Sequence, residues 1–176
     1  MKQQGIKKKV KNVTKLIMLF MIISCSTLKK SVDNQNDIKN ILENIINKNQ
    51  VYYKTIIKDL GKPIDYYIEP HLLEFHLCGS ELNNDLITIT NNEIDSLKIE
   101  FSNQKVTIIN KLDLNIKNNL TKKQKLNTSF ISMPVLFRNN HLAIYYSYSR
   151  NGGGFNLLKK INGEWKNICA NSVWIE

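Results

Sequence analysis

The sequence is poor in the residues that mark several large classes of protein. Its 176 residues include only seven glycines and three prolines, which excludes collagen-like and low-complexity chains. Hydrophobic residues make up 42% of the chain and charged residues 23%, the composition of a globular domain. The length allows one ordinary domain and leaves little for a second.

Arginine is almost absent, because only two of the 25 basic residues are Arg. Six of the lysines fall within the first 15 residues, and no acidic residue occurs before Asp33. Without this segment, 19 basic residues face 15 acidic ones, and the net charge drops from +10 to +4. Proteins that bind nucleic acids usually use Arg for bidentate contacts to bases and phosphates. We therefore expect no nucleic-acid partner.

Motifs of catalysis are also missing. The sequence contains no G-x-S-x-G, no H-E-x-x-H and no paired-carboxylate motif. Catalytic groups can converge from distant positions, so this absence disfavours an enzyme without excluding one. We predict no catalytic residue, no metal and no cofactor.

One short segment concentrates side chains that could carry chemistry, namely His71, Glu74, His76 and Cys78. On a strand, the last three would share a face, but a zinc site would need further ligands from elsewhere. The spacing matches no zinc-finger or protease motif. We expect a half-exposed strand edge here, and the segment is where a hydrolytic site would lie if the chain were an enzyme.

Long apolar runs are lacking as well. Residues 16–23 form an unbroken apolar run, which as a helix would cover about 12 Å, against roughly 30 Å for the hydrocarbon core of a bilayer. The run follows the cationic segment and precedes Ser24-Cys25 and a polar stretch. A charged segment followed by a short apolar run is typical of a secretory signal peptide.

The residues Ile22-Ile23-Ser24-Cys25 resemble the lipobox of bacterial lipoprotein signal peptides, although Leu is commonest where Ile22 stands. This resemblance implies cleavage before Cys25 and acylation of Cys25, for example with palmitate. Several acyl chains anchor a protein stably, because each buried CH₂ contributes about 0.8 kcal/mol. The expected organisation is a signal peptide over 1–24, a lipid-anchored tether over 25–36 and a single domain over 37–176.

The residue after Cys25 indicates whether the anchor is held in the inner or the outer membrane. In the lipoprotein family an Asp at this position retains the protein at the inner membrane, and here it is Ser26. No acidic cluster follows, and Lys29 and Lys30 stand there instead. The resemblance implies lipid anchoring to the outer membrane on its periplasmic face, with the cell surface as the alternative.

The two remaining cysteines are Cys78 and Cys169. An oxidising compartment favours one disulfide between them. The alternative is two buried free thiols that act as small apolar side chains.

Apolar periodicity predicts the N-terminal elements. Residues 38–46 carry one apolar stripe, and the stripe can be extended to Leu60 as one helix or two. Thr90 and Glu93 have the spacing of a capping box, which predicts a second helix near 92–103. Short strands are expected at 73–77 and 106–109.

The last third of the chain predicts β-hairpins. Asn139-Asn140 and Asn162-Gly163 are turn signals, and Asn151 to Gly154 is expected to form the turn between them. The expected registers pair Phe137 with Leu142 and Val135 with Ile144, then Leu157 with Ile168 and Phe155 with Ala170. The predicted fold class is α+β, with one or two N-terminal helices packed on one face of a C-terminal antiparallel β-meander.

An aromatic-rich segment is the remaining candidate for binding. Side chains that could stack on a sugar or a peptide are Tyr145, Tyr146, Tyr148, Arg150 and Trp165, although core packing is their first explanation. Lys122, Lys123 and Lys125 are expected in a solvated loop.

The mature domain resembles small uncharacterised envelope lipoproteins of Gram-negative bacteria, through Ser132-Met133-Pro134-Val135 and Asn162-Gly163-Glu164-Trp165-Lys166. This resemblance implies no particular activity. The leading hypothesis is a lipid-anchored binding or scaffolding domain, whose partners are the membrane and an unknown envelope protein or glycan. The alternatives are an envelope hydrolase and an inhibitor or immunity lipoprotein.

The lipobox generates the first testable prediction. Cys25→Ser removes the thiol that would be acylated, so we expect the variant to leave the membrane fraction or to keep its signal peptide. Fractionation and the mass of the mature chain measure both effects. Identical behaviour of wild type and variant as soluble cytoplasmic protein would contradict the lipobox interpretation.

Overall fold

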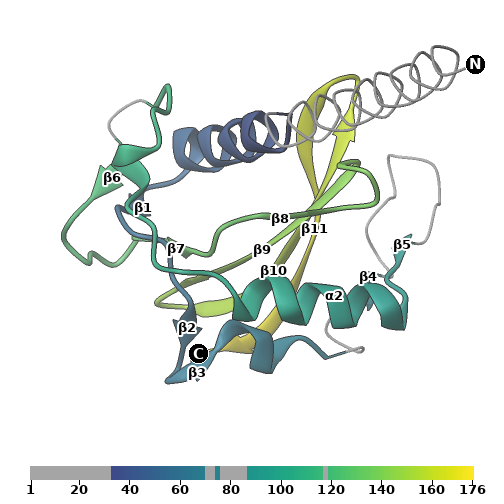
Figure 1. Cartoon of the computed structure of the whole chain (residues 1–176). Coiled ribbons are helices and arrows are strands. Elements are labelled where there is room, and N and C mark those ends of the chain that lie inside the picture. Colours follow the sequence, from purple (N-terminus) through teal and green to yellow (C-terminus); the bar gives the residue numbers. More distant parts are fainter. Residues whose placement is uncertain (1–32, 70–73, 76–86, 117–118) are drawn as a thin grey trace, which may run out of the picture. The chain divides into compact units, whose positions relative to one another are not determined.

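The computed structural model describes residues 33–69, 74–75, 87–116 and 119–176 (Figure 1). The chain divides into two compact units, Met1–Asn36 and Asp37–Glu176. Of the first unit, residues 33–36 are described, and they are helical although the sequence assigned them to the tether. Apart from these four residues, which continue into the helix of the second unit, all that follows concerns the second unit.

The first helix runs over residues 33–48 and ends where Asn47 and Asn49 break its apolar stripe. Its four core side chains, Ile41, Leu42, Ile45 and Ile46, are at most 7% exposed. Both the backbone and the side-chain N–H of Asn49 donate to the carbonyl of Ile45, which satisfies the helix end. The possible extension to Leu60 is wrong, because strand β1 (Val51–Tyr52) begins three residues after the helix.

Five antiparallel strands form the main sheet: β7 (Phe130–Ile131), β8 (Val135–Phe137), β9 (Leu142–Ser149), β10 (Gly152–Ile161) and β11 (Glu164–Ile175). Their order is β11-β10-β9-β7, and β8 also pairs with β9. The α+β class with a C-terminal meander is therefore confirmed. The Asn162-Gly163 turn is confirmed too, with φ of 51° and 84° as a type I′ turn requires.

The registers are partly as predicted. Phe137 pairs with Leu142 and Val135 with Ile144, as expected. Leu157 pairs with Cys169 instead of Ile168, and Phe155 with Asn171 instead of Ala170. The difference arises at a register shift between Leu157 and Leu158: Leu158 pairs with Asn167 and Leu157 with Cys169, so β11 has one extra residue, Ile168, at this point.

The turn between β9 and β10 also differs from the prediction. Ser149 pairs with Gly152, so the turn consists of Arg150 and Asn151. Gly152, Gly153 and Gly154 belong to β10 and extend the sheet. The glycines thus provide a strand surface without side chains, not a flexible loop.

The two helices cover opposite faces of the sheet, so the expectation of helices on one face is wrong. The first helix packs in a core with Ala143, Tyr145, Leu158 and Trp165. Helix α2 (Asn91–Ser102) packs in a second core with Ile144, Tyr146, Phe155 and Leu157. Successive side chains of a strand point to opposite faces, which places the two cores on either side of β9 and β10. Figure 1 shows the first helix and α2 above and below the strands.

Smaller elements border the sheet. β1 pairs in parallel with β6 (Leu120–Thr121), β2 (Lys58–Asp59) with β3 (Lys62–Pro63), and β4 (Glu74–Phe75) with β5 (Ile87–Thr88). The described residues also include the 3₁₀ helices η1 (Ile64–Tyr67) and η3 (Ile109–Lys111). The strand predicted at 106–109 is wrong: Ile108 forms an isolated bridge with Lys54, and η3 follows it.

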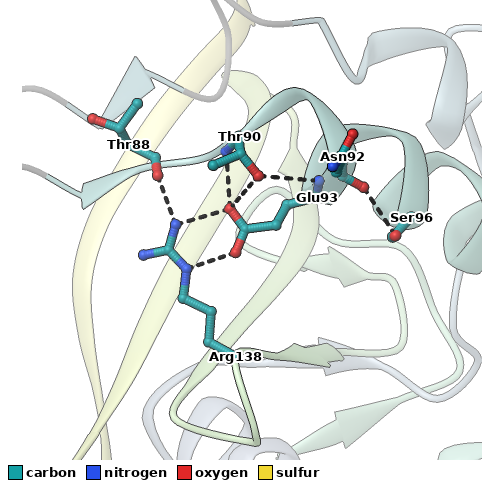
Figure 2. A network of polar contacts seen from close by, with 6 residues as sticks. All are labelled: Thr88, Thr90, Asn92, Glu93, Ser96 and Arg138. Atoms are coloured by element: carbon teal, nitrogen blue, oxygen red, sulfur yellow. Dashed lines mark hydrogen bonds and ion pairs between the residues drawn. The ribbon is translucent and has the colours of Figure 1, made fainter.

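Helix α2 begins with the predicted capping box, because Thr90 accepts from the Glu93 backbone and Glu93 accepts from the Thr90 backbone. Arg138, in the β8–β9 turn, donates to both carboxylate oxygens of Glu93 at 2.6 and 2.8 Å and to the Thr88 carbonyl (Figure 2). Arg138 has a φ of 51°, which is uncommon for a residue with a side chain. Its bidentate pair therefore ties α2 to a strained turn of the sheet.

This pair generates a pH-dependent prediction. The hydrogen bonds from Arg138, followed by those from Thr90, lower the pKa of Glu93 from its ordinary value of 4.5 to about 2. A lowered folded-state pKa stabilises the fold above about pH 4.5, and this contribution disappears as the pH falls through about 2. Both side chains are partly exposed, so solvent screening limits the contribution to about 1 kcal/mol.

We expect Glu93→Gln to lower the free energy of unfolding by about 1 kcal/mol at pH 7, and the difference from wild type to vanish towards pH 2. Urea denaturation across this pH range measures both values. Glu100→Gln, on an exposed carboxylate of the same helix, is the control and should change neither. A difference that persists at pH 2 would contradict the assignment to the ion pair.

Candidate functional site

Three hydrogen-bond donors converge on Asp59, a carboxylate at the end of β2 that is 5% exposed. Tyr146 Oη and Trp174 Nε1 both donate to Oδ2, each at 2.6 Å. Tyr67 Oη donates to the backbone carbonyl of Asp59 at 2.8 Å. We call these four residues the Asp59 cluster.

Local backbone geometry brings the cluster together. Leu60 and Gly61 have φ of 45° and 78°, which makes a tight turn immediately after Asp59. On the sheet, Gly153 pairs with Trp174 across β10 and β11. A Cβ on Gly153 would lie 2.6 Å from Trp174 Nε1 and Tyr146 Oη. The cluster therefore occupies the space that a side chain at Gly153 would need.

The electrostatics of Asp59 are unusual for a buried carboxylate. Within the described part of the chain, no cation lies within ion-pairing distance of it, and Oδ1 accepts no hydrogen bond. Burial and, after it, the hydrogen bond to Asp59 raise the pKa of Tyr146 far above its ordinary value, which keeps Tyr146 a neutral donor. Among the described residues, the fully buried side-chain atom without a hydrogen-bond partner is Gln104 Oε1, so Asp59 Oδ1 is open to solvent.

Asp59 lies in the wall of a cavity of about 430 Å³. Aromatic side chains form part of this wall: Tyr148 stacks on Phe130 with ring centroids 4.7 Å apart and an interplanar angle of 8°. Trp174 is half-buried there and is held by its bond to Asp59. Charged side chains that line the cavity besides Asp59 are Lys125, Arg150 and Glu176, all exposed. We call this space the Asp59 cavity.

A second hollow of about 350 Å³ adjoins the Asp59 cavity, because both are lined by Tyr148, Ser149 and Trp174. The strand faces of β9, β10 and β11 supply most of its lining, including Gly152 to Gly154. None of the described residues that line it is charged. Asn156 Nδ2 donates to Ser147 Oγ at 2.9 Å across the strands. We call this hollow the polar groove.

A larger hollow, of about 690 Å³, lies between the first helix and the β10–β11 hairpin. Its aromatic residue, Trp165, is only 4% exposed. Trp165 Nε1 donates to Asp37, which also pairs with Lys160 Nζ at 2.5 Å. Asn44 donates to the Trp165 carbonyl. The polar groups of Trp165 are thus satisfied by Asn44 and Asp37, and its ring is buried, so this hollow is the weaker candidate.

The residues predicted from the aromatic-rich segment divide between core and site. Tyr145 and Trp165 belong to the core against the first helix. Tyr146 belongs to the other core and also to the Asp59 cluster, while Tyr148 and Arg150 line the Asp59 cavity. Sequence reasoning missed Asp59 and Trp174, whose only signals were an isolated acid before a Leu-Gly turn and a Trp in a terminal strand.

Most of the other predicted site residues lie outside the described part of the chain, namely Cys25, His71, His76 and Cys78, and of Glu74 only the backbone is described. Cys169 is disulfide-bonded. It lies on β11, which contacts β4, and β4 begins four residues before Cys78 in the sequence. Cys78 stays its predicted partner. His141 is exposed, and so are Lys122, Lys123 and Lys125.

Within the described residues, no three His, Cys, Asp or Glu side chains are grouped as a metal would require. No described helix is both long and apolar enough to cross a membrane. Comparison of the chain with protein-family models, with curated proteins and with solved structures finds no match. The argument for function therefore depends on the geometry of the Asp59 cavity and on the sequence.

Gly153→Ala tests the packing of the Asp59 cluster. The backbone at Gly153 does not have positive φ, so the substitution acts only through its new methyl group. We expect it to displace Trp174 and to lower the free energy of unfolding by about 1–3 kcal/mol, as overpacking does. Urea denaturation and tryptophan fluorescence measure the two effects.

The double variant Gly153→Ala, Trp174→Ala provides the control. If the methyl group clashes with the indole, the two losses of stability are not additive, and the double variant is more stable than their sum predicts. Additive losses would contradict the close approach of Trp174 to Gly153.

Proposed function

We propose that the chain is a lipid-anchored protein of the bacterial outer membrane whose second unit is a binding module facing the periplasm. The anchor is supported by the cationic leader, the short apolar run and Ile22-Ile23-Ser24-Cys25. The binding site is the Asp59 cavity. Its partner is a component of the envelope, either a protein or a glycan.

The observation that carries this proposal is the largely buried carboxylate of Asp59, whose Oδ2 accepts two hydrogen bonds while Oδ1 is open to solvent in the wall of the cavity. Two donors fix Oδ2 in place, and Oδ1 is left free to accept from water or from a ligand. A ligand that covers this charge has to replace its water with donors, because a carboxylate oxygen buried without a donor is costly. Binding sites in general are concave, with aromatic walls and a few convergent polar groups, as the Asp59 cavity is.

The lining also favours binding over hydrolysis. Neither His nor Cys is among the described residues that line the Asp59 cavity. A nucleophile activated by a His, as in Ser-His and Cys-His enzymes, therefore has no counterpart among them. The aromatic and Arg side chains that are present are the types enriched at interaction hot spots.

Two buried aspartates give a matched test of this proposal. Asp37 and Asp59 each accept a bond from a Trp Nε1, but only Asp37 has a Lys partner. We expect Asp37→Asn to destabilise the protein by about 1–3 kcal/mol, because Lys160 loses its carboxylate. We expect Asp59→Asn to change the stability by less than about 1 kcal/mol, because the amide oxygen still accepts while no charge is buried.

The same variants can be heated with glycan and protein fractions of the envelope. A ligand stabilises the folded protein that binds it, so one fraction should raise the midpoint of unfolding of wild type but not of Asp59→Asn. Equal destabilisation by the two substitutions would make Asp59 a structural residue and contradict the proposal. The proposal would also be contradicted if the fractions stabilised Asp59→Asn as much as wild type.

A further inference from the structure

We propose that the Asp59 cavity and the polar groove together bind a neutral saccharide chain. This inference depends on the proposed function, because it names the ligand class of the same site. It follows from the charge of the lining, from its hydrogen-bonding groups and from its aromatic surfaces.

Charge favours a neutral ligand. The Asp59 cavity is lined by two cations, Lys125 and Arg150, and by two acids, Asp59 and Glu176. The polar groove adds no charge from its described lining. A polyanion or polycation would meet no excess of opposite charge along this surface, and such an excess is what attracts charged ligands.

The hydrogen-bonding groups suit hydroxyls. Asp59 Oδ1 can only accept and is open to solvent, so the ligand group that binds it must be a donor. Besides Asn156 and Ser147, which bond each other, the polar groove is lined by Ser and Asn side chains, which both donate and accept: Ser129, Ser149, Asn151 and Ser172. A hydroxyl also donates and accepts, so a ligand with a hydroxyl on most carbons matches both parts of the site.

The aromatic side chains suit the C–H face of a sugar ring. Trp174 is fixed by its bond to Asp59, and Tyr148 is supported from behind by Phe130. Both line the junction of the cavity and the groove. Rigid aromatic rings provide a large contact area for an apolar face at a low cost in conformational entropy.

The strands argue against an extended peptide as the ligand. A peptide that adds to a sheet pairs with the free backbone groups of an edge strand. β9 and β10 are internal strands, each paired on both sides. β11, the edge strand, also lines the polar groove, but its free backbone groups point away from β10, in the plane of the sheet. The groove lies over strand faces, so it offers a peptide no row of free backbone groups.

Trp174 provides the readout for a test. The chain has two tryptophans, so in Trp165→Phe the fluorescence reports on Trp174 alone. The full-length lipoprotein is purified in a detergent without a sugar headgroup and titrated with maltohexaose, cellohexaose or chitohexaose. Polygalacturonate and hexalysine are the charged probes. We expect at least one neutral hexasaccharide to shift the emission and to bind about tenfold more tightly than its monosaccharide, because the groove extends the site.

The same titration in the variants assigns the binding to the site. Asp59→Asn should weaken it about tenfold or more, and Asp95→Asn, on an exposed carboxylate of α2, should leave it unchanged. In wild type, calorimetry gives the affinity independently of fluorescence, and circular dichroism verifies that each variant is folded.

Two results would overturn the saccharide assignment: tighter binding of a charged probe, or no binding of any neutral saccharide up to about 10 mM. If an envelope protein fraction still stabilises wild type but not Asp59→Asn, the binding function stands and only the ligand class is wrong. If no fraction and no probe acts through Asp59, both proposals fail.

Discussion

The burial of strand β9 on both faces is the constraint on which the rest of the domain depends. Its residues Ile144 and Tyr146 point towards α2, and Ala143 and Tyr145 point towards the first helix. Each helix therefore has its own core, and β9 is common to both. A slip of one residue in β9 would exchange the two sets of side chains and damage both cores at once. The turns at either end of β9 fix its register against this slip.

The Asp59 cluster adjoins the core that α2 shares with the same sheet. Tyr146 belongs to the core and to the cluster, so the rigid interior positions the donor that holds Asp59. Trp174, on the last strand, contributes the second donor. A site built on packed strands holds its side chains more accurately than one built on loops, which supports its interpretation as a binding site.

Local sequence signals predicted the helices and turns well, but they did not predict which residues distant in the sequence come together in the fold. Asn162-Gly163 and the Thr90–Glu93 spacing act within a few residues, and both formed as expected. The observed register of β10 against β11 differs from the predicted one because a bulge cannot be recognised in the apolar pattern. Helices on two faces were missed because the apolar run of β9 was assigned to one face, although such runs are typical of strands buried on both. Asp59 meets its donors 87 and 115 residues along the chain, a distance at which periodicity carries no information.

The dependence on β9 has a consequence for the order in which the chain can fold. The first helix comes early in the sequence, yet its core is closed by residues between 143 and 165. The core of α2 likewise includes Phe155 and Leu157, which come late in the sequence. A chain that emerges from its N-terminal end therefore cannot complete either core until most of it has been synthesised. Such late closure leaves both cores open during synthesis, which is compatible with the export that the proposed lipid anchor requires.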